Sequence, residues 1–405
     1  MAATNIGDTL ARLRKDRGMT QKELAEKLNV SDKTVSKWEK GQSYPDVTIF
    51  PLLSSIFGVS IDYLMLNKKG ITVAGNMIAD VVKSIVEFPK VGMLTHINDI
   101  SLSVGGCAPN TAIDLARIDP RLPVNVCGMV GTDENGRFIL STLQKHGINV
   151  DRVCALPNTP TSFCDVMSMP SGERTFFHKK GTNAEFSPAH IDIKGLNCDI
   201  FHIGYILLLD KFDAPDPEYG TVMARFLKKV QQSGIKTSID VVSDNSADYG
   251  KAIAPALAYC DYVIINEIEC CNIWGLDAYD DAGNLNRQNI RLAMEKAVEA
   301  GLRNKVIVHS KTVRFLLDGA SGEFIEVPSL KIPPEEIKGS VGAGDAFCAG
   351  CLYGLYNHFP SKRILEFASA AAACNLFAAN SIDGMKSRDE IFEMENKYER
   401  IGGKI

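Results

Sequence analysis

Long apolar runs are what this chain of 405 residues most clearly lacks. No run approaches the roughly 20 consecutive apolar residues that a membrane-spanning helix needs. The first residues, MAATNIGDTLARLRKDRG, contain no apolar core of the kind that secretory signal peptides carry. We therefore expect a cytoplasmic protein with no membrane partner.

A regular cysteine framework is also missing, because the 11 cysteines are odd in number and irregularly spaced. Cys348 and Cys351 form a single CxxC inside an apolar helical segment. A redox or metal role would need a second pair or nearby histidines. We therefore interpret both as packing residues on a helix face, and we interpret the adjacent Cys270 and Cys271 in the same way.

Two common phosphate-binding motifs are absent. The chain contains no GxxxxGK[ST], which excludes a P-loop. Gly342-x-Gly344 lacks the third glycine of the dinucleotide fingerprint, because Phe347 stands at that position.

Length and charge divide the chain into two predicted domains, residues 1–67 and 71–405, joined by the short linker Asn67-Lys-Lys-Gly70. Residues 1–69 hold 11 Lys and Arg against 8 Asp and Glu, whereas the remainder holds 33 against 41. The first part alone has the charge to meet a polyanion such as DNA.

The first domain reads as short helices. Thr20 and Glu23 form a capping box, Asn29 breaks the helix that follows, and Ser31 caps the next one. Val35 and Trp38 face inward from that third helix. Two short helices joined by a tight turn are the helix-turn-helix pattern.

The stretch MTQKELAEKLNVSDKTVSKWEKGQSYPD resembles the Cro/repressor-type helix-turn-helix family. The resemblance implies that the third helix enters the major groove of DNA, and that a dimer reads a two-fold site. The matching DNA-binding positions are Gln21, Asp32, Lys33, Thr34 and Lys37. A helical module that contacts only proteins remains the alternative.

In the second domain, apolar strand-like runs alternate with helical ones, starting with residues 71–74, 124–130 and 200–206 and continuing with 237–242, 262–268 and 305–310. Gly147, Gly234 and Gly301 stand where left-handed helix ends belong. This alternation predicts an α/β fold with a mostly parallel central sheet flanked by helices. Ligands in such sheets bind at the carboxyl ends of the strands. Residues 85–104 and 160–178, with Ser171-Gly172 as a hairpin turn, are predicted to form a small β lid.

The stretch GSVGAGDAF, residues 339–347, combines a glycine turn with an aspartate at the head of a predicted helix, Asp345–Tyr356. Free amide groups at a helix start bind anions without a lysine. Asp345 at the same point can take a proton from a hydroxyl that attacks phosphorus. A simple turn is the alternative for this stretch alone.

Four further motifs accompany it: GNMIAD (75–80), VGGCAPNTA (104–112), GMVGTDENG (128–136) and IINEIE (264–269). All five, in this order, resemble the ribokinase-like or phosphofructokinase-B family of carbohydrate kinases, over about residues 71–395. The resemblance implies transfer of the terminal phosphate of ATP to a sugar or nucleoside hydroxyl with Mg²⁺. It also implies a β lid, and lid contacts together with DNA reading lead us to expect a homodimer.

The resemblance assigns roles by position. Asp345 is implied as the catalytic base, with the backbone of Gly342, Ala343 and Gly344 as the anion hole. The implied sugar-binding residues are Asp80, Gly105, Gly106 and Asn110, and Arg174 and Asn183 near the lid are further candidates. Asn266 and Glu269 are implied for Mg²⁺ and phosphate binding. Structural alternatives remain: Asp80 caps a turn, Asn110 caps the helix after Pro109, and Asn266 and Glu269 are surface loop residues. For Arg174 and Asn183, the alternative is that they are simply solvated.

Two positions depart from the family pattern. Gly339 stands where the family usually has an aspartate that helps hold a monovalent cation, so activation by K⁺ is doubtful. His309, Ser310 and Lys311 stand where the family usually has Thr-x-Gly beside the nucleotide phosphates, and Lys311 either binds phosphate or obstructs the nucleotide. Two hypotheses follow: an active kinase with a DNA-binding domain, or a sugar-sensing regulator with little catalysis. The substrate stays open among ribose, fructose, a ketodeoxy sugar acid and a nucleoside, with a preference for a furanose-like sugar.

Overall fold

A computed structural model describes residues 6–57, 61–66, 69–169, 173–243 and 248–402. The chain folds into two compact units, of which the smaller comprises residues 1–70, 120–123 and 197–199 and the larger comprises the rest. Part of the predicted linker, residues 67–68, and the predicted turn Ser171-Gly172 lie outside the described residues. Within the described ranges, no helix has both the length and the apolar character to cross a bilayer.

The smaller unit contains the helices α1 (Ile6–Asp16), α2 (Gln21–Leu28), α3 (Asp32–Glu39), α4 (Phe50–Phe57) and α5 (Ile61–Leu66). The predicted capping box of Thr20 and Glu23 is present, and the Ser31 side chain accepts from the amide of Thr34. Asn29 turns the chain with a φ of 54° between α2 and α3. Val35 and Trp38 are buried with leucines of α1, α2 and α4, as the sequence predicts.

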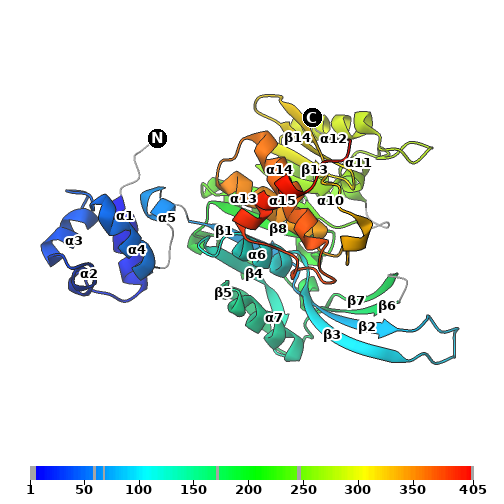
Figure 1. Cartoon of the computed structure of the whole chain (residues 1–405), viewed down its shortest axis with the longest axis horizontal. Coiled ribbons are helices and arrows are strands. Elements are labelled where there is room, and N and C mark those ends of the chain that lie inside the picture. The colour runs from blue at the N-terminus through cyan, green and yellow to red at the C-terminus, as the bar shows by residue number, and fades with distance from the viewer. Residues whose placement is uncertain (1–5, 58–60, 67–68, 170–172, 244–247, 403–405) are drawn as a thin grey trace. The chain divides into compact units, whose positions relative to one another are not determined.

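The larger unit is built on a nine-stranded sheet in the order β15-β14-β13-β12-β11-β8-β1-β4-β5 (Figure 1). Its strands are β1 (Ile71–Gly75), β4 (Val124–Gly131), β5 (Asn149–Leu156), β8 (Ile200–Ile206), β11 (Lys236–Val241), β12 (Tyr262–Asn266), β13 (Lys305–His309), β14 (Val313–Asp318) and β15 (Phe324–Pro328). The pairs from β5 to β13 are parallel, and β14 and β15 join antiparallel. The predicted mostly parallel sheet is thereby confirmed.

Helices cover this sheet, which is why β1 is buried on both faces. They are α6 (Cys107–Ile118), α7 (Glu134–Lys145), α9 (Val222–Gln232), α10 (Tyr249–Leu257), α11 (Glu267–Asn272), α12 (Arg287–Glu299), α13 (Ala343–Tyr356), α14 (Ser361–Asn375) and α15 (Arg388–Lys397), with a short α8 (Asp210–Asp213) before the two-residue strands β9 (Pro215–Asp216) and β10 (Gly220–Thr221). Gly147, Gly234 and Gly301 have positive φ after α7, α9 and α12, as predicted.

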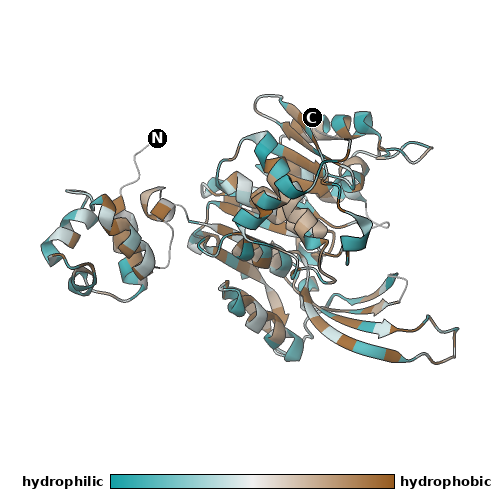
Figure 2. Ribbon diagram, viewed as in Figure 1, coloured by the Kyte–Doolittle hydropathy of each residue, from teal (hydrophilic) through white to brown (hydrophobic). Residues whose placement is uncertain are grey.

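A second sheet of four strands, in the order β3-β2-β6-β7, projects from the body of the larger unit (Figure 1). It consists of β2 (Ile78–Ile85), β3 (Ile97–Gly105), β6 (Phe163–Ser168) and β7 (Arg174–Lys179). The predicted lid boundaries need correction: residues 86–96 contain no strand, and β2 lies before the predicted range 85–104. The sequence of β2, IADVVKSI, does not alternate strictly between polar and apolar residues, which agrees with a strand that is partly buried along most of its length. Brown and teal segments alternate along β3 in Figure 2, consistent with a strand that is largely exposed.

Candidate active site

Four strands of the central sheet end beside one cavity of about 250 Å³. Tyr205 lies at the end of β8, Asp240 near the end of β11, Asn266 at the end of β12 and His309 at the end of β13, and all four line the cavity. Gly344 and Asp345, from the first turn of α13, close it. Parallel strands therefore converge with a helix start, as expected at the carboxyl edge of such a sheet.

Asp345 is the central group of this edge. Its side chain is buried, with Oδ2 accepting a hydrogen bond from Nδ2 of Asn110 at 2.8 Å and Oδ1 accepting one from the hydroxyl of Tyr205 at 2.9 Å. Burial raises the pKa of Asp345, and these two hydrogen bonds counteract part of that rise. The carboxylate is thus held in one orientation and is more basic than an ordinary aspartate.

Asp80 is the second carboxylate near this edge. Burial and the Asp345 carboxylate raise the pKa of Asp80 to about 6, against the opposing effect of Arg174. A Cβ atom at Gly105 would stand 2.2 Å from Oδ2 of Asp80, so glycine makes the room that this carboxylate occupies. Asp80 lies inside β2 and does not cap a turn. Gly106, with a φ of 85°, immediately precedes α6 as its N-cap residue.

The glycine turn before α13 has the geometry that the sequence suggests. Gly342 is left-handed with a φ of 78°, and a Cβ atom there would meet the backbone of Ser381 at 2.6 Å. Ala343 donates its amide to the carbonyl of Ser340 at 3.2 Å. Gly344 and Asp345 stand in the first turn, where amide groups have no preceding helical acceptor. The turn therefore offers amides to an anion beside Asp345.

A larger cavity of about 610 Å³ adjoins the first and shares Asn266, His309 and Gly344 with it. Lys311 and the buried Arg314 line its wall. The Nε of Arg314 is buried with no hydrogen-bond partner among the described residues, and burial lowers its pKa to about 10. Ser310 instead holds a turn, donating to the carbonyl of Val313 and accepting from its amide. An elongated anionic ligand fits a cavity that leads from these cations to the amides of α13.

Asn266 and Glu269 form the capping box of α11. Glu269 donates its amide to Asn266 Oδ1 at 2.8 Å and accepts the amide of Asn266 at 2.9 Å and the hydroxyl of Ser243 at 2.8 Å. Glu269 is buried, which excludes the surface-loop alternative, and burial raises its pKa to about 7. Both residues nevertheless line the smaller cavity. The side-chain oxygens of Asn266 and Glu269, with Asp240 nearby, are ligands of the type that Mg²⁺ prefers, and they could hold the ion through water molecules.

The structure uses three predicted residues differently. Asn110 does not cap a helix, because α6 begins earlier, at Cys107, and Asn110 faces Asp345 from inside it. Asn183 is buried, with Oδ1 accepting the amide of Met77 at 3.1 Å and Nδ2 donating to the carbonyl of Met77 at 3.3 Å, so its side chain holds the backbone that follows β1. Arg174 donates to the carbonyl of Ala379 at 3.1 Å, which leaves its charge near Asp80.

Gly339 departs from the family pattern in a way that the packing explains. A Cβ atom there would lie 3.0 Å from the carbonyl oxygen of Ala378 and 3.3 Å from that of Ala379. A larger side chain at this position would have to move that backbone. The expected lack of a side-chain ligand for a monovalent cation at Gly339 therefore stays a prediction.

Tyr205, Asp240 and Arg314 were missed from the sequence. Tyr205 and Asp240 stand at or beside the carboxyl ends of β8 and β11, whereas Arg314 stands near the start of the antiparallel β14, opposite His309 at the end of β13. For Tyr205 and Asp240 the sequence holds a general signal, because polar residues at the carboxyl ends of parallel strands commonly face a ligand.

The predicted DNA-binding residues lie in the smaller unit, four of them in the first turns of α2 and α3 and Lys37 in the last turn of α3. Asp32, Lys33 and Lys37 are exposed, and Thr34 is partly exposed with its hydroxyl 2.8 Å from that of Ser31. Gln21 donates to Glu39 at 2.8 Å. Glu39 also pairs with Arg14 through two hydrogen bonds, at 2.6 and 2.9 Å, which ties α1, α2 and α3 together.

Comparison with known proteins separates the two units in the same way. The model of the pfkB family carbohydrate kinases matches residues 68–388, and a helix-turn-helix model matches residues 10–64. A ribokinase from Schizosaccharomyces pombe is 25% identical over 332 residues, covering 80% of this chain and 98% of its own. A 5-dehydro-2-deoxygluconokinase from Geobacillus thermodenitrificans is 23% identical over 304 residues, covering 71% and 82%.

Solved structures show the same fold. A ribokinase from Thermotoga maritima superimposes with a TM-score of 0.66 at 20% identity, covering 81% of this chain and 99% of that one. An Arabidopsis thaliana ribokinase complexed with ribose and ATP also gives a TM-score of 0.66, at 21% identity and the same coverage. The ribokinase-like fold predicted from the motifs is confirmed.

Proposed function

The chain belongs to the pfkB family of carbohydrate kinases, and on that premise we propose that it transfers the terminal phosphate of ATP to a hydroxyl of a furanose-like sugar, with Asp345 as the base. The observation that carries the proposal is the buried Asp345 carboxylate, fixed by Asn110 and Tyr205 beside the amides that begin α13. The domain boundaries proposed are 1–67 for DNA binding and 71–405 for the kinase.

Asp345 would accept the proton of the sugar hydroxyl as that oxygen attacks phosphorus. Asn110 and Tyr205 orient the carboxylate, and its raised pKa makes it a stronger base. The amides of the turn Gly342–Gly344 would stabilise charge on the transferred group; that of Ala343 must first leave Ser340. Mg²⁺, held through Asn266 and Glu269, would neutralise the phosphate oxygens. Lys311 and Arg314 would bind the remaining charge of the nucleotide.

Asp80 is the proposed anchor for sugar hydroxyls. Carboxylate oxygens accept from hydroxyl groups, and Gly105 leaves the space in which this carboxylate lies. Relatives named ribokinase and 2-dehydro-3-deoxygluconokinase both resemble this chain, the second from Escherichia coli at 25% identity over 264 residues. The names of these relatives point to more than one sugar substrate, and we propose a furanose-like sugar among them.

A panel assay tests this function. Purified full-length protein is offered ATP, Mg²⁺ and ribose, fructose, 2-dehydro-3-deoxygluconate or a nucleoside, and ADP release is measured. Asp345→Asn should lower kcat by about 10²–10⁴-fold while circular dichroism stays unchanged. Ala320→Ser, in an exposed turn after β14, is a control that should keep full activity. Wild-type turnover in Asp345→Asn would refute the assignment of the base.

DNA binding by residues 1–67, in a cytoplasmic homodimer, completes the proposal. The exposed lysines of α3 support DNA contact, and exposed apolar side chains on the lid, including Ile100, Phe176 and Phe177, support a lid-mediated dimer. Sedimentation velocity of wild type and Ile100→Asp tests the dimer, because a charge in that contact should yield monomers. An unchanged monomer or an unchanged dimer in both samples would contradict it.

The sugar-sensing alternative remains a second candidate because Lys311 lines the larger cavity and Tyr205 occupies one oxygen of Asp345. It predicts that sugar alone shifts DNA affinity in a protein that releases no ADP. Turnover of any sugar in the panel would decide against it as the sole function.

A further inference from the structure

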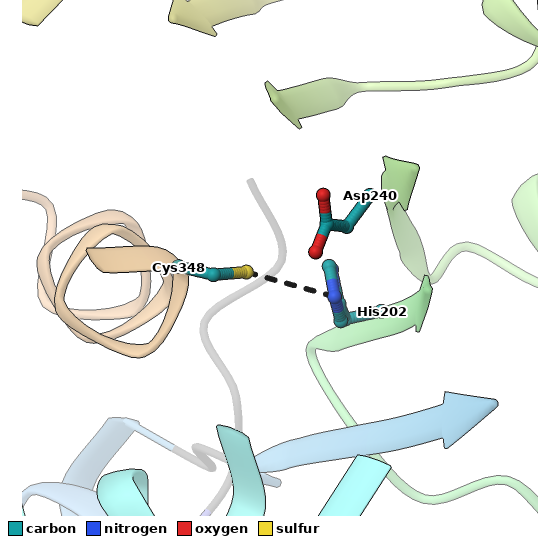
Figure 3. Close-up of side chains that lie close together, drawn as sticks. All are labelled: His202, Asp240 and Cys348. Atoms are coloured by element: carbon teal, nitrogen blue, oxygen red, sulfur yellow. Dashed lines mark hydrogen bonds between the residues drawn. The ribbon is translucent and has the colours of Figure 1, made fainter. Parts of the chain in front are cut away.

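A cluster of three buried side chains lies beside the smaller cavity, and none of the three has a role in the proposed transfer. It consists of His202 on β8, Asp240 on β11 and Cys348 on α13. One nitrogen, one oxygen and one sulfur from these residues all lie within 4.8 Å of one another. Figure 3 shows Cys348 pointing toward the imidazole of His202, with the carboxylate of Asp240 beside it.

The spacing of the cluster matches a metal site. Nε2 of His202 lies 3.6 Å from Sγ of Cys348. Tetrahedral zinc, with bonds of about 2.3 Å to sulfur and about 2.0–2.1 Å to nitrogen, separates those two atoms by about 3.6 Å. The same distance also suits a hydrogen bond between the thiol and the imidazole. The groups around this pair therefore decide whether a metal site is the better interpretation.

Those groups are arranged as metal sites require. Nδ1 of His202 lies 3.0 Å from the hydroxyl of Ser238, which fixes the ring and directs Nε2 toward Cys348. Asp240 accepts the amide of Val241 at 2.7 Å, which holds its carboxylate in place. Asp240 and Cys348 also line the cavity of about 250 Å³, which supplies an entry path and room for water as a fourth ligand.

We propose that His202, Asp240 and Cys348 bind one zinc-class divalent transition metal beside the active-site cavity, which Asp240 and Cys348 line. Coordination replaces the S–H bond of Cys348 with a metal–sulfur bond, and the proton passes to the buffer. A thiolate and an imidazole select zinc or cobalt over Mg²⁺, which prefers oxygen ligands. The site is thus distinct in chemistry from the Mg²⁺ position at Asn266 and Glu269.

The position of the site gives it a consequence for the reaction. Asp345 lines the same cavity, so a bound dication with its water would stand where the base and the transferred phosphate must meet. Zinc should therefore inhibit turnover in the presence of excess Mg²⁺. This consequence rests on the proposed kinase activity, whereas metal binding itself does not.

The test titrates metal-free full-length protein with Co²⁺ and then Zn²⁺, in excess Mg²⁺, followed by absorbance and calorimetry. Wild type should bind one Co²⁺ with a thiolate-to-cobalt charge-transfer band, and Zn²⁺ should displace it. Cys348→Ser should lose the band and at least tenfold in zinc affinity. Cys351→Ser, a buried cysteine of the same helix and one of 11 free cysteines, should keep both.

Absence of the band from wild type, or an equal band in Cys348→Ser, overturns the site. Asp240→Asn provides a second variant if Cys348→Ser does not fold: it should keep the band and bind zinc at least tenfold more weakly. Equal affinity in that variant removes Asp240 from the site. Turnover is then compared with and without zinc, each variant against its own metal-free rate. Full wild-type turnover with zinc bound overturns the inhibition and leaves the binding result standing.

Discussion

The hydroxyl of Tyr205 donates a hydrogen bond of 2.9 Å to Oδ1 of Asp345, across 140 residues of sequence. This bond stabilises the ionised carboxylate and opposes the effect of burial, which raises the pKa of Asp345. Tyr205→Phe should therefore raise the pKa of Asp345 further, because the ionised carboxylate loses one of its two side-chain hydrogen bonds. Because the base must be ionised, the acid limb of kcat/KM should move to higher pH.

The measurement is a pH profile of kcat/KM for wild type and Tyr205→Phe. Activity near the alkaline plateau should stay close to wild type, because the base is ionised there in both proteins. Tyr262→Phe, a change of the same kind on β12, serves as control and should leave the acid limb in place. An acid limb that does not move in Tyr205→Phe would show that the tyrosine does not tune the base.

Local signals in the sequence predict much of this site. The glycine turn predicts a helix that starts at Asp345, and α13 starts two residues earlier, at Ala343, after the left-handed Gly342. The alternation of apolar runs predicts the parallel sheet. Both predictions depend only on residues that are close together in the sequence. The contact of Tyr205 with Asp345 depends on how β8 faces α13, which no short stretch specifies.

The same reason limits what the sequence predicts elsewhere. Cys348 and Cys351 are buried, in agreement with the packing interpretation, whereas the contact of Cys348 with His202 joins residues 146 positions apart in the chain. Asn183 reads as a substrate contact, but the folded chain brings the backbone of Met77 to its amide. The predicted lid boundary is wrong because the residues of β2 do not alternate strictly between polar and apolar, in a strand that is partly buried along most of its length.

Gly105→Ala should weaken sugar binding. Its new Cβ would meet Oδ2 of Asp80 at 2.2 Å, so the carboxylate must move from the position that we assign to sugar contact. We expect KM for the sugar to rise at least tenfold with a smaller change in kcat, in initial-rate assays. Ser103→Ala, at the β3 position that pairs with Asp80, tests whether any change in β3 has this effect. An unaltered KM in Gly105→Ala would remove Asp80 from the sugar site.

Lys311→Met should weaken the binding of ATP. Lys311 lines the larger cavity and its side chain is exposed, so it can place a positive charge near the nucleotide phosphates. Loss of that charge should raise KM for ATP about three- to tenfold, with KM for the sugar unchanged. Lys229→Met on α9 makes the same change in an exposed lysine away from the cavity and should have no effect. A lower KM for ATP in Lys311→Met would show that this lysine obstructs the nucleotide.

The lysines of α3 should determine how DNA binding depends on salt. Lys33 and Lys37 are exposed on the helix proposed to face the major groove. Each phosphate contact that is lost should lower the slope of log affinity against log salt by about 0.9. Lys33→Ala and Lys37→Ala are therefore compared with wild type by fluorescence anisotropy, using a duplex of randomised sequence at several salt concentrations.

Lys229→Ala makes the same change in net charge and should bind like wild type, since its charge lies in the larger unit. If the α3 variants kept the wild-type affinity and slope, the helix-turn-helix unit would not bind DNA through this face. The module that contacts only proteins would then be the better interpretation of residues 1–67.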